Sequence, residues 1–220
     1  MCFSATASIA AGAALSATGA VTLSKVRKRK EILFASIPLL FGIQQIIDGV
    51  VWLSFASPIL NTVATYAYAV FAFALWPVYV PWAALLLETK RKRREVLEAL
   101  AVVGACVGIV FAYAIIAGGV TARVLNHCVA YDTPHPHPIG ILAFYLLATC
   151  GPFFVSSKKL LNVLGAVLLV SFGIAGWFYF DTFSSTWCFF SAIISGIIYW
   201  YFEQTSTVRS RRIRTRNAAA

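Results

Sequence analysis

The sequence predicts an all-α membrane protein of seven transmembrane helices, with the N-terminus outside and the C-terminus inside. Of its 220 residues, 60% are hydrophobic and only 12% are charged, whereas soluble domains carry about 25% charged residues. The apolar residues form long runs, most of them without a polar face, which excludes a soluble helical core. Crossing about 30 Å of hydrocarbon takes about 20 apolar residues. Seven segments meet this requirement: about 3–23, 32–56, 59–87, 96–118, 139–156, 160–180 and 184–202.

The basic residues predict how these helices are oriented. Seventeen of the 18 lysines and arginines follow the first, third, fifth and seventh segments, at 25–30, 90–94, 158–159 and 209–216, and only Arg123 lies on the other side. Cytoplasmic loops are enriched in Lys and Arg, so we expect these segments inside, with the protein in the inner (plasma) membrane. The net charge of +10 then reflects orientation and contact with membrane lipid, and no nucleic-acid partner is expected.

The short connections predict one domain, a seven-helix bundle over 1–208 followed by a basic cytoplasmic tail over 209–220.

The first segment is rich in Ala, Gly and Ser, which let helices approach closely in lipid, so we expect it deep in the bundle. Gly104 and Gly108 form a small-xxx-small pair of the same kind. Three prolines within the predicted spans should kink them: Pro77, Pro81 and Pro152. The glutamates at the inner ends lie beside basic clusters that can pair with them: Glu31, Glu88, Glu95, Glu98 and Glu203.

With this orientation, most residues capable of chemistry lie on the outer side. Asp48 lies in the outer half of the second span and shares a helix face with Gln44 and Gln45, while Trp52 extends that face outward. A carboxylate within hydrocarbon costs roughly 2.5–3.5 kcal/mol, so such residues usually face a cavity or the bundle interior. One interpretation is a structural network that ties the second span to its neighbours. The other is an outward-facing polar pocket in which Asp48 is the catalytic or proton-binding group and Gln44, Gln45, Trp52 and Asp181 contact the substrate.

The outer stretch HCVAYDTPHPHP, residues 127–138, contains every histidine of the chain. In extended backbone His135 and His137 point the same way and can reach one metal ion, with His127 and Cys2 as further candidate ligands for zinc or copper. The alternative is a rigid proline-rich lid, because the threefold period of polyproline II would separate the two imidazoles.

The outer cysteines are predicted to meet an oxidising compartment, in which disulfides persist. A bond between Cys128 and Cys188 would join the histidine-rich stretch to the seventh span, and Cys2 can replace either partner. Pairing within this set therefore stays open.

Several motifs together resemble a bacterial integral-membrane family catalogued as a domain of unknown function. They are MCFSATAS, FGIQQIIDGVVW, WPVYVP, PHPHP, ATCGP and TWCFF, and the resemblance runs from Met1 to about Phe202. It implies a polytopic membrane fold, and it implies no activity, cofactor or site residue.

Three functions are compatible with these features. The preferred hypothesis is a membrane-embedded, metal-assisted enzyme that acts on a lipid or small amphiphile, with Asp48 as general base. The second is a small-molecule or proton-coupled transporter in which Asp48 titrates, and the absence of buried ionisable residues from the inner half of the predicted spans counts against it. The third is a membrane sensor or binding module.

Overall fold

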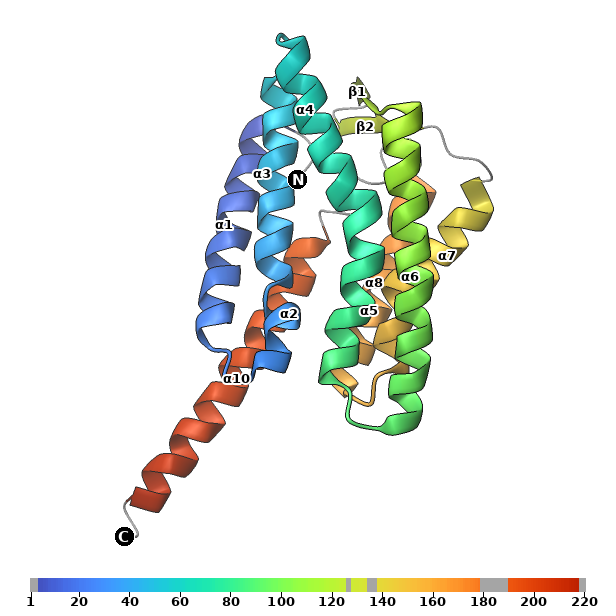
Figure 1. Cartoon of the computed structure of the whole chain (residues 1–220). Helices are drawn as coiled ribbons and strands as arrows, with labels where there is room; N and C mark the ends of the chain where they lie inside the picture. The colour runs from blue at the N-terminus through green and yellow to red at the C-terminus, as the bar shows by residue number, and fades with distance from the viewer. Residues whose placement is uncertain (1–3, 126–127, 134–137, 179–189, 218–220) are drawn as a thin grey trace.

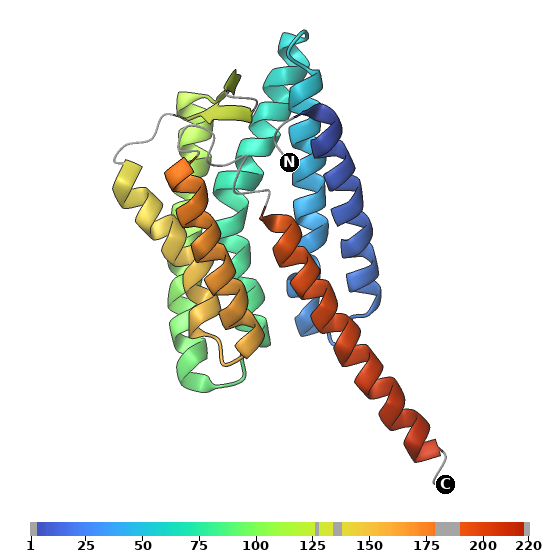
Figure 2. The same cartoon turned by 180° about the vertical axis from the view of Figure 1, so that it is seen from behind.

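The computed structural model describes residues 4–125, 128–133, 138–178 and 190–217. It is mostly helical, with long helices side by side and one β-hairpin at one end (Figures 1 and 2). The helices are α1 (Ala5–Ser24), η1 (Arg29–Glu31), α2 (Ile32–Ala35), α3 (Ile37–Leu53), α4 (Pro58–Ala69), the π-helical η2 (Val70–Leu75), α5 (Trp76–Leu87), α6 (Arg91–Gly118), α7 (Pro138–Val155), α8 (Lys159–Phe178) and α10 (Ser191–Asn217).

In the described part of the chain, five helical segments are long and apolar enough to cross a membrane. They are Ala5–Ser24, Arg29–Leu53, Pro58–Leu87, Arg91–Gly118 and Lys159–Trp177. The predicted fifth span corresponds to a shorter apolar helix, Gly140–Val155. The predicted seventh span begins in residues outside the described ones. A helical membrane-protein fold is therefore supported, and the count of seven crossings stays a prediction.

The predicted basic tail is helical in the structure. Helix α10 continues through it to Asn217. The segment after Gly196 contains neither Gly nor Pro, so no residue in it strongly disfavours a helix.

The four basic segments lie at the same end of the bundle, opposite the β-hairpin (Figure 1). They occupy the turn after α1, the α5–α6 turn, the α7–α8 turn and the free end of α10. The largest buried apolar cluster also lies toward this end, and it includes Phe34, Leu97, Leu161, Leu164 and Ile198.

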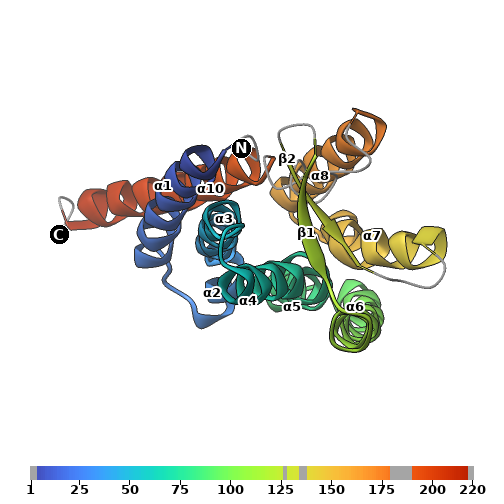
Figure 3. The same ribbon diagram turned by 90° about the horizontal axis from the view of Figure 1, so that it is seen from above.

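Helix α1 lies at the edge of the bundle (Figure 3), so the expectation that it sits deep within the bundle is wrong. Its main partner is α3. A Cβ atom on Gly12 would collide with the α3 backbone at Gly42, and a Cβ atom on Gly42 would collide with Ser16 of α1. The small residues of α1 thus serve close contact with one neighbouring helix, and they do not require burial on every side.

The predicted small-xxx-small pair packs as expected. Gly104 faces the carbonyl group of Pro77, and Gly108 faces that of Ala74. The predicted kink in the third span takes the form of the π-helical segment η2, just before Pro77. Because proline has no N–H, the carbonyl oxygen of Phe73 loses its ordinary α-helical donor, and a π-helical turn is one way in which a helix accommodates this loss.

Glu88, directly after α5, ties together two turns at the basic end. Its carboxylate accepts hydrogen bonds from the backbone N–H groups of Thr89, Lys90 and Ser157 and from the Ser157 hydroxyl, at 2.6–2.9 Å. Burial alone would raise the pKa of this carboxyl group, but the hydrogen bonds outweigh burial and lower the pKa to about 2. The expected pairing of Glu88 with a basic side chain is replaced by these donors, whereas Glu95 pairs with Arg91 as expected.

Candidate functional site

A β-hairpin occupies part of the predicted outer loop. Strand β1 (Thr121–Leu125) pairs with the antiparallel strand β2 (Cys128–Asp132), and Ala122 lies opposite Tyr131. Gly119, with a φ of 78°, turns the chain from α6 toward the hairpin. An exposed ion pair at 2.6 Å joins Arg123 to Asp132 across the strands. Strand β2 is buried from Cys128 to Tyr131, whereas strand β1 is largely exposed.

Tyr131 brings the hairpin into contact with Asp48. The phenol of Tyr131 donates to Oδ1 of Asp48 at 2.7 Å, and the Ser8 hydroxyl of α1 donates to Oδ2 at 2.7 Å. The Tyr131 ring stacks on Tyr68 of α4, with ring centroids 4.0 Å apart and planes 9° apart. Asp48 itself is 2% exposed. One carboxylate therefore links α1, α3 and the β1–β2 hairpin, and we call Asp48 with Ser8, Tyr68 and Tyr131 the Asp48 centre.

Gln44, four residues before Asp48, reaches α5 with its amide oxygen. Its Oε1 accepts a hydrogen bond from Nε1 of Trp76 at 2.8 Å. The Trp76 ring stacks on Phe41, with centroids 4.2 Å apart. Gln44 thus links α3 to α5, and its role in substrate contact stays a prediction.

Gln45 and Trp52 carry polar atoms that are buried and unsatisfied. Among the described residues, neither Oε1 of Gln45 nor Nε1 of Trp52 has a hydrogen-bond partner. Trp52 packs beside the cluster that Val51 and Tyr68 form with the hairpin, as the predicted outward extension of the Asp48 face.

The remaining predicted site residues lie outside the described part of the chain: Asp181, His127, His135, His137, Cys2 and Cys188. Cys128 is buried in β2, and it forms no disulfide with the two other described cysteines, Cys106 and Cys150. Within residues 4–125, 128–133, 138–178 and 190–217, no group of three His, Cys, Asp or Glu side chains could hold a metal ion. The zinc or copper site and the Cys128–Cys188 bond stay predictions.

Sequence reasoning missed Ser8, Tyr68 and Tyr131 as members of the Asp48 centre. Tyr131 lies within the histidine-rich stretch itself, where the histidines and the cysteine carried the metal and disulfide arguments. The available signal was β alternation, because Val129 and Tyr131 are two apart and share the buried cluster.

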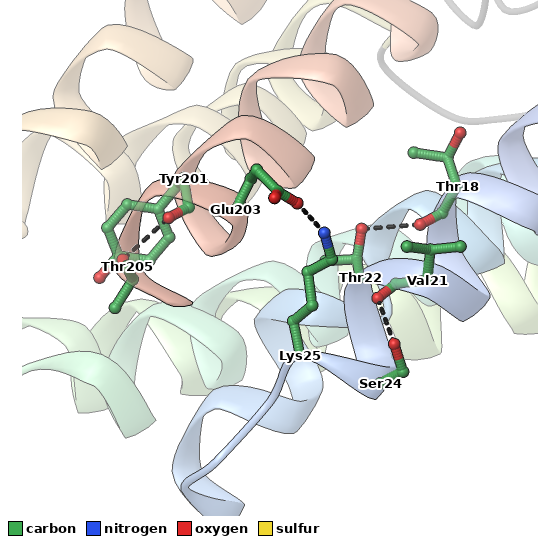
Figure 4. Close-up of polar contacts among 8 residues, drawn as sticks. All are labelled: Thr18, Val21, Thr22, Ser24, Lys25, Tyr201, Glu203 and Thr205. Atoms are coloured by element: carbon green, nitrogen blue, oxygen red, sulfur yellow. Dashed lines mark hydrogen bonds and ion pairs between the residues drawn. The ribbon is translucent and has the colours of Figure 1, made fainter. Parts of the chain in front are cut away.

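At the basic end of the bundle, an ion pair joins the end of α1 to α10. Lys25, which follows α1, pairs with Glu203 of α10 (Figure 4). The Lys25 ammonium also lies over the Tyr199 ring, 4.7 Å from its centroid. Glu203 is half-exposed and Lys25 is more buried. Helix α10 thus carries, near its middle, an acidic side chain that pairs with the end of α1.

A family model described as "Family of unknown function (DUF6629)" matches residues 1–214, which is nearly the whole chain. No curated protein and no solved structure matches the chain. The family match agrees with the resemblance drawn from the sequence motifs and covers every helix that contributes to the Asp48 centre. The chain therefore belongs to the family of unknown function DUF6629.

Proposed function

We propose that the protein is a proton-coupled carrier of a small amphiphile, in which Asp48 takes up and releases the proton. The supporting observation is that both oxygens of this buried carboxylate accept hydroxyl donors, from Ser8 of α1 and Tyr131 of the hairpin. Ionisable residues inside membrane spans are costly and commonly mark proton relays and substrate pathways.

Protonation of Asp48 would change its contacts with both neighbours. An ionised carboxylate only accepts hydrogen bonds, whereas a protonated carboxyl group also donates one. Where the carboxyl proton is donated toward Ser8 or Tyr131, that hydroxyl turns and accepts it. Because Tyr131 belongs to the hairpin that covers Asp48, proton uptake would loosen or shift this cover. An alternating-access carrier needs this kind of coupling, in which proton binding changes whether the substrate can reach the binding site.

The proposed orientation places the hairpin outside and the basic end in the cytoplasm, with seven crossings of the inner (plasma) membrane. The common end of the four basic segments supports it, because such segments mark the cytoplasmic side. Fusion of green fluorescent protein and of alkaline phosphatase to the C-terminus tests it. Fluorescence without phosphatase activity is expected, and the opposite result would contradict the orientation.

Proton uptake is tested on the purified protein. Infrared spectra recorded across a pH series should show a protonated carboxyl band that is lost in Asp48→Asn. The matched control is Asp132→Asn, which alters an exposed carboxylate of the hairpin. In liposomes loaded with a pH-sensitive dye, pH-driven proton flux in the presence of a panel of short-chain amines and fatty acids should fall to background in Asp48→Asn and persist in Asp132→Asn. Unchanged flux in Asp48→Asn would refute the proposal.

The second candidate is the membrane-embedded enzyme that acts on a lipid or small amphiphile. The Ser8–Asp48 distance of 2.7 Å favours it, because a hydroxyl beside a base is the arrangement of an activated nucleophile. Asp48 would take the Ser8 proton as the Ser8 oxygen adds to the carbonyl carbon of a lipid ester, whose π electrons move onto the carbonyl oxygen. The bond from the carbonyl carbon to the leaving alkoxide would then break, and the protonated Asp48 would return the proton to that alkoxide. A serine-directed fluorophosphonate probe should then label wild-type protein and fail to label Ser8→Ala. Elemental analysis tests the metal-assisted form, whose candidate ligands are His127, His135, His137 and Cys2. Absence of both label and metal would remove this candidate.

A further inference from the structure

We infer that the interface of α1, α3 and α10 holds a chain of water molecules that leads from Asp48 toward the Lys25–Glu203 pair. This inference rests on the proposed function and supplies the inner half of the proton path. It is drawn from buried polar atoms of this interface that have no hydrogen-bond partner among the described residues and that lie between two charged groups.

Three such atoms come from the three helices. They are Oγ of Ser16 on α1, Oε1 of Gln45 on α3 and Oγ of Ser195 on α10, and within the described parts of the chain none has a hydrogen-bond partner. Gln45 is 3% exposed and Ser195 is 0% exposed. A buried polar atom without a partner costs about 1–3 kcal/mol, and native proteins satisfy nearly all of them with protein or ordered water.

The three atoms lie at similar depth. Gln45 belongs to the stretch of α3 where Gly42 packs on Ser16. Ser195 is eight residues outward of Glu203, about 12 Å along the helix, and Ser16 is nine residues outward of Lys25, about 13 Å. Because Lys25 and Glu203 touch, Ser16 and Ser195 reach about the same level on neighbouring helices.

Ser195 also lies on the side of α10 that is turned toward α1. It is four residues from Tyr199, whose ring lies under the Lys25 ammonium, so the two residues share a helix face, and α10 packs against α1 and α3. Figures 1 and 2 both show the outer end of α10 beside α3. Ordered waters that bond to Ser16, Gln45 and Ser195 would satisfy all three atoms, since a buried water makes two to four hydrogen bonds.

The two ends of this chain are charged groups. Asp48 lies three residues outward of Gln45 on α3, about 4.5 Å along the helix. Glu203 lies about 12 Å inward of Ser195, a gap that about four waters at hydrogen-bond spacing would bridge. The titratable groups around the inner end are Lys25, Tyr199, Tyr201 and Glu31, the last of which acts on Tyr201. Glu203 is half-exposed, so it can exchange a proton with water at the inner surface.

Cysteine accessibility tests hydration without relying on transport. The five native cysteines are replaced by Ala, and Ser195→Cys is introduced into this background. The matched control is Ala148→Cys in α7, where Ala148 is 0% exposed and carries no polar side-chain atom. Membrane-impermeant methanethiosulfonate reagent is applied to each side of sealed vesicles. Modification of Ser195→Cys at least tenfold faster than Ala148→Cys is expected, and equal rates would overturn the inference.

Gln45→Leu gives an independent test, because leucine removes the unpaired acceptor at similar volume. If the interface is dry, this variant should melt above the wild-type temperature and keep full proton flux, which would overturn the inference. If waters bind there, flux should fall at least tenfold in a variant that elutes as a folded monodisperse protein.

The water chain and the carrier can be refuted separately. Loss of flux in Asp48→Asn together with an inaccessible Ser195→Cys would remove the water chain and leave the carrier. A reactive Ser195→Cys together with unchanged flux in Asp48→Asn would keep the water chain and remove the carrier.

Discussion

Tyr131→Phe removes one hydroxyl from the Asp48 centre and leaves the ring stack on Tyr68 in place. The lost bond is a 2.7 Å donation to a buried carboxylate. Hydrogen bonds to charged groups contribute about 1.5–3 kcal/mol to stability. For a chain of this size, 1 kcal/mol corresponds to about 2–4 °C in melting temperature, so the expected loss is about 3–12 °C.

The assay is a thermal-shift measurement on detergent-purified protein, with Tyr113→Phe as the matched control. Tyr113 is 72% exposed on α6, so removal of its hydroxyl should leave the melting temperature within about 1–2 °C of wild type, as is usual for exposed sites. A double-mutant cycle with Asp48→Asn then isolates the pair. Direct contact predicts a coupling energy within about 0.5–3 kcal/mol. A Tyr131→Phe variant that melts with the wild type, or a coupling of zero, would refute the assignment of Tyr131 as a donor to Asp48.

Other predictions concern the basic end, the helix contacts and the hairpin. Glu88→Gln should abolish a pH-dependent part of stability: because the pKa of Glu88 lies at about 2 against an ordinary 4.5, its contribution is complete above pH 4.5 and is lost as the pH falls toward 2. Melting curves across this range should converge for wild type and variant, and parallel curves would contradict the assignment. Gly104→Ala should destabilise the protein by about 1–3 kcal/mol through overpacking, while Gly173→Ala, with nothing within 4 Å of the added carbon, should be neutral or stabilising in the same melts. Arg123→Ala should change stability by less than about 1 kcal/mol, because its ion pair with Asp132 is exposed; a larger shift in denaturant or heat would show that the hairpin depends on it.

Hydrophobic runs and charge placement predicted the helical fold and the polarity of its ends, because both follow from local composition. They did not predict the position of α1, since small residues report how closely two helices approach and not how many neighbours surround them. Gly12 and Gly42 meet each other at one interface, and the remaining faces of α1 need no such contact.

The candidate site was predicted in part, for a related reason. Asp48 could be identified from the sequence alone, because a carboxylate within a long apolar segment is rare and is expected to face the interior of the bundle. Its donors come from residues 40 positions earlier and 83 positions later, and no periodicity within one element reports such pairings. Gln44 shares a helix face with Asp48, and its contact with Trp76 of α5 is another long-range pairing that the helix face does not predict. Helix periodicity gives the side on which a residue lies, and the long-range packing decides its partner.

Asp48 and Glu88 are the two buried carboxylates in the described part of the chain. They have different kinds of donors, and the difference supports different roles. Three backbone N–H groups hold Glu88, and an N–H group cannot become an acceptor, so this environment favours the ionised form alone. The described donors to Asp48 are the hydroxyls of Ser8 and Tyr131, and a hydroxyl can donate or accept. These two contacts can therefore accommodate both protonation states of Asp48 with a change in hydroxyl orientation. Asp48→Asn should therefore still fold while losing proton uptake. Glu88→Gln should weaken the fold, because its NH₂ group would face N–H donors.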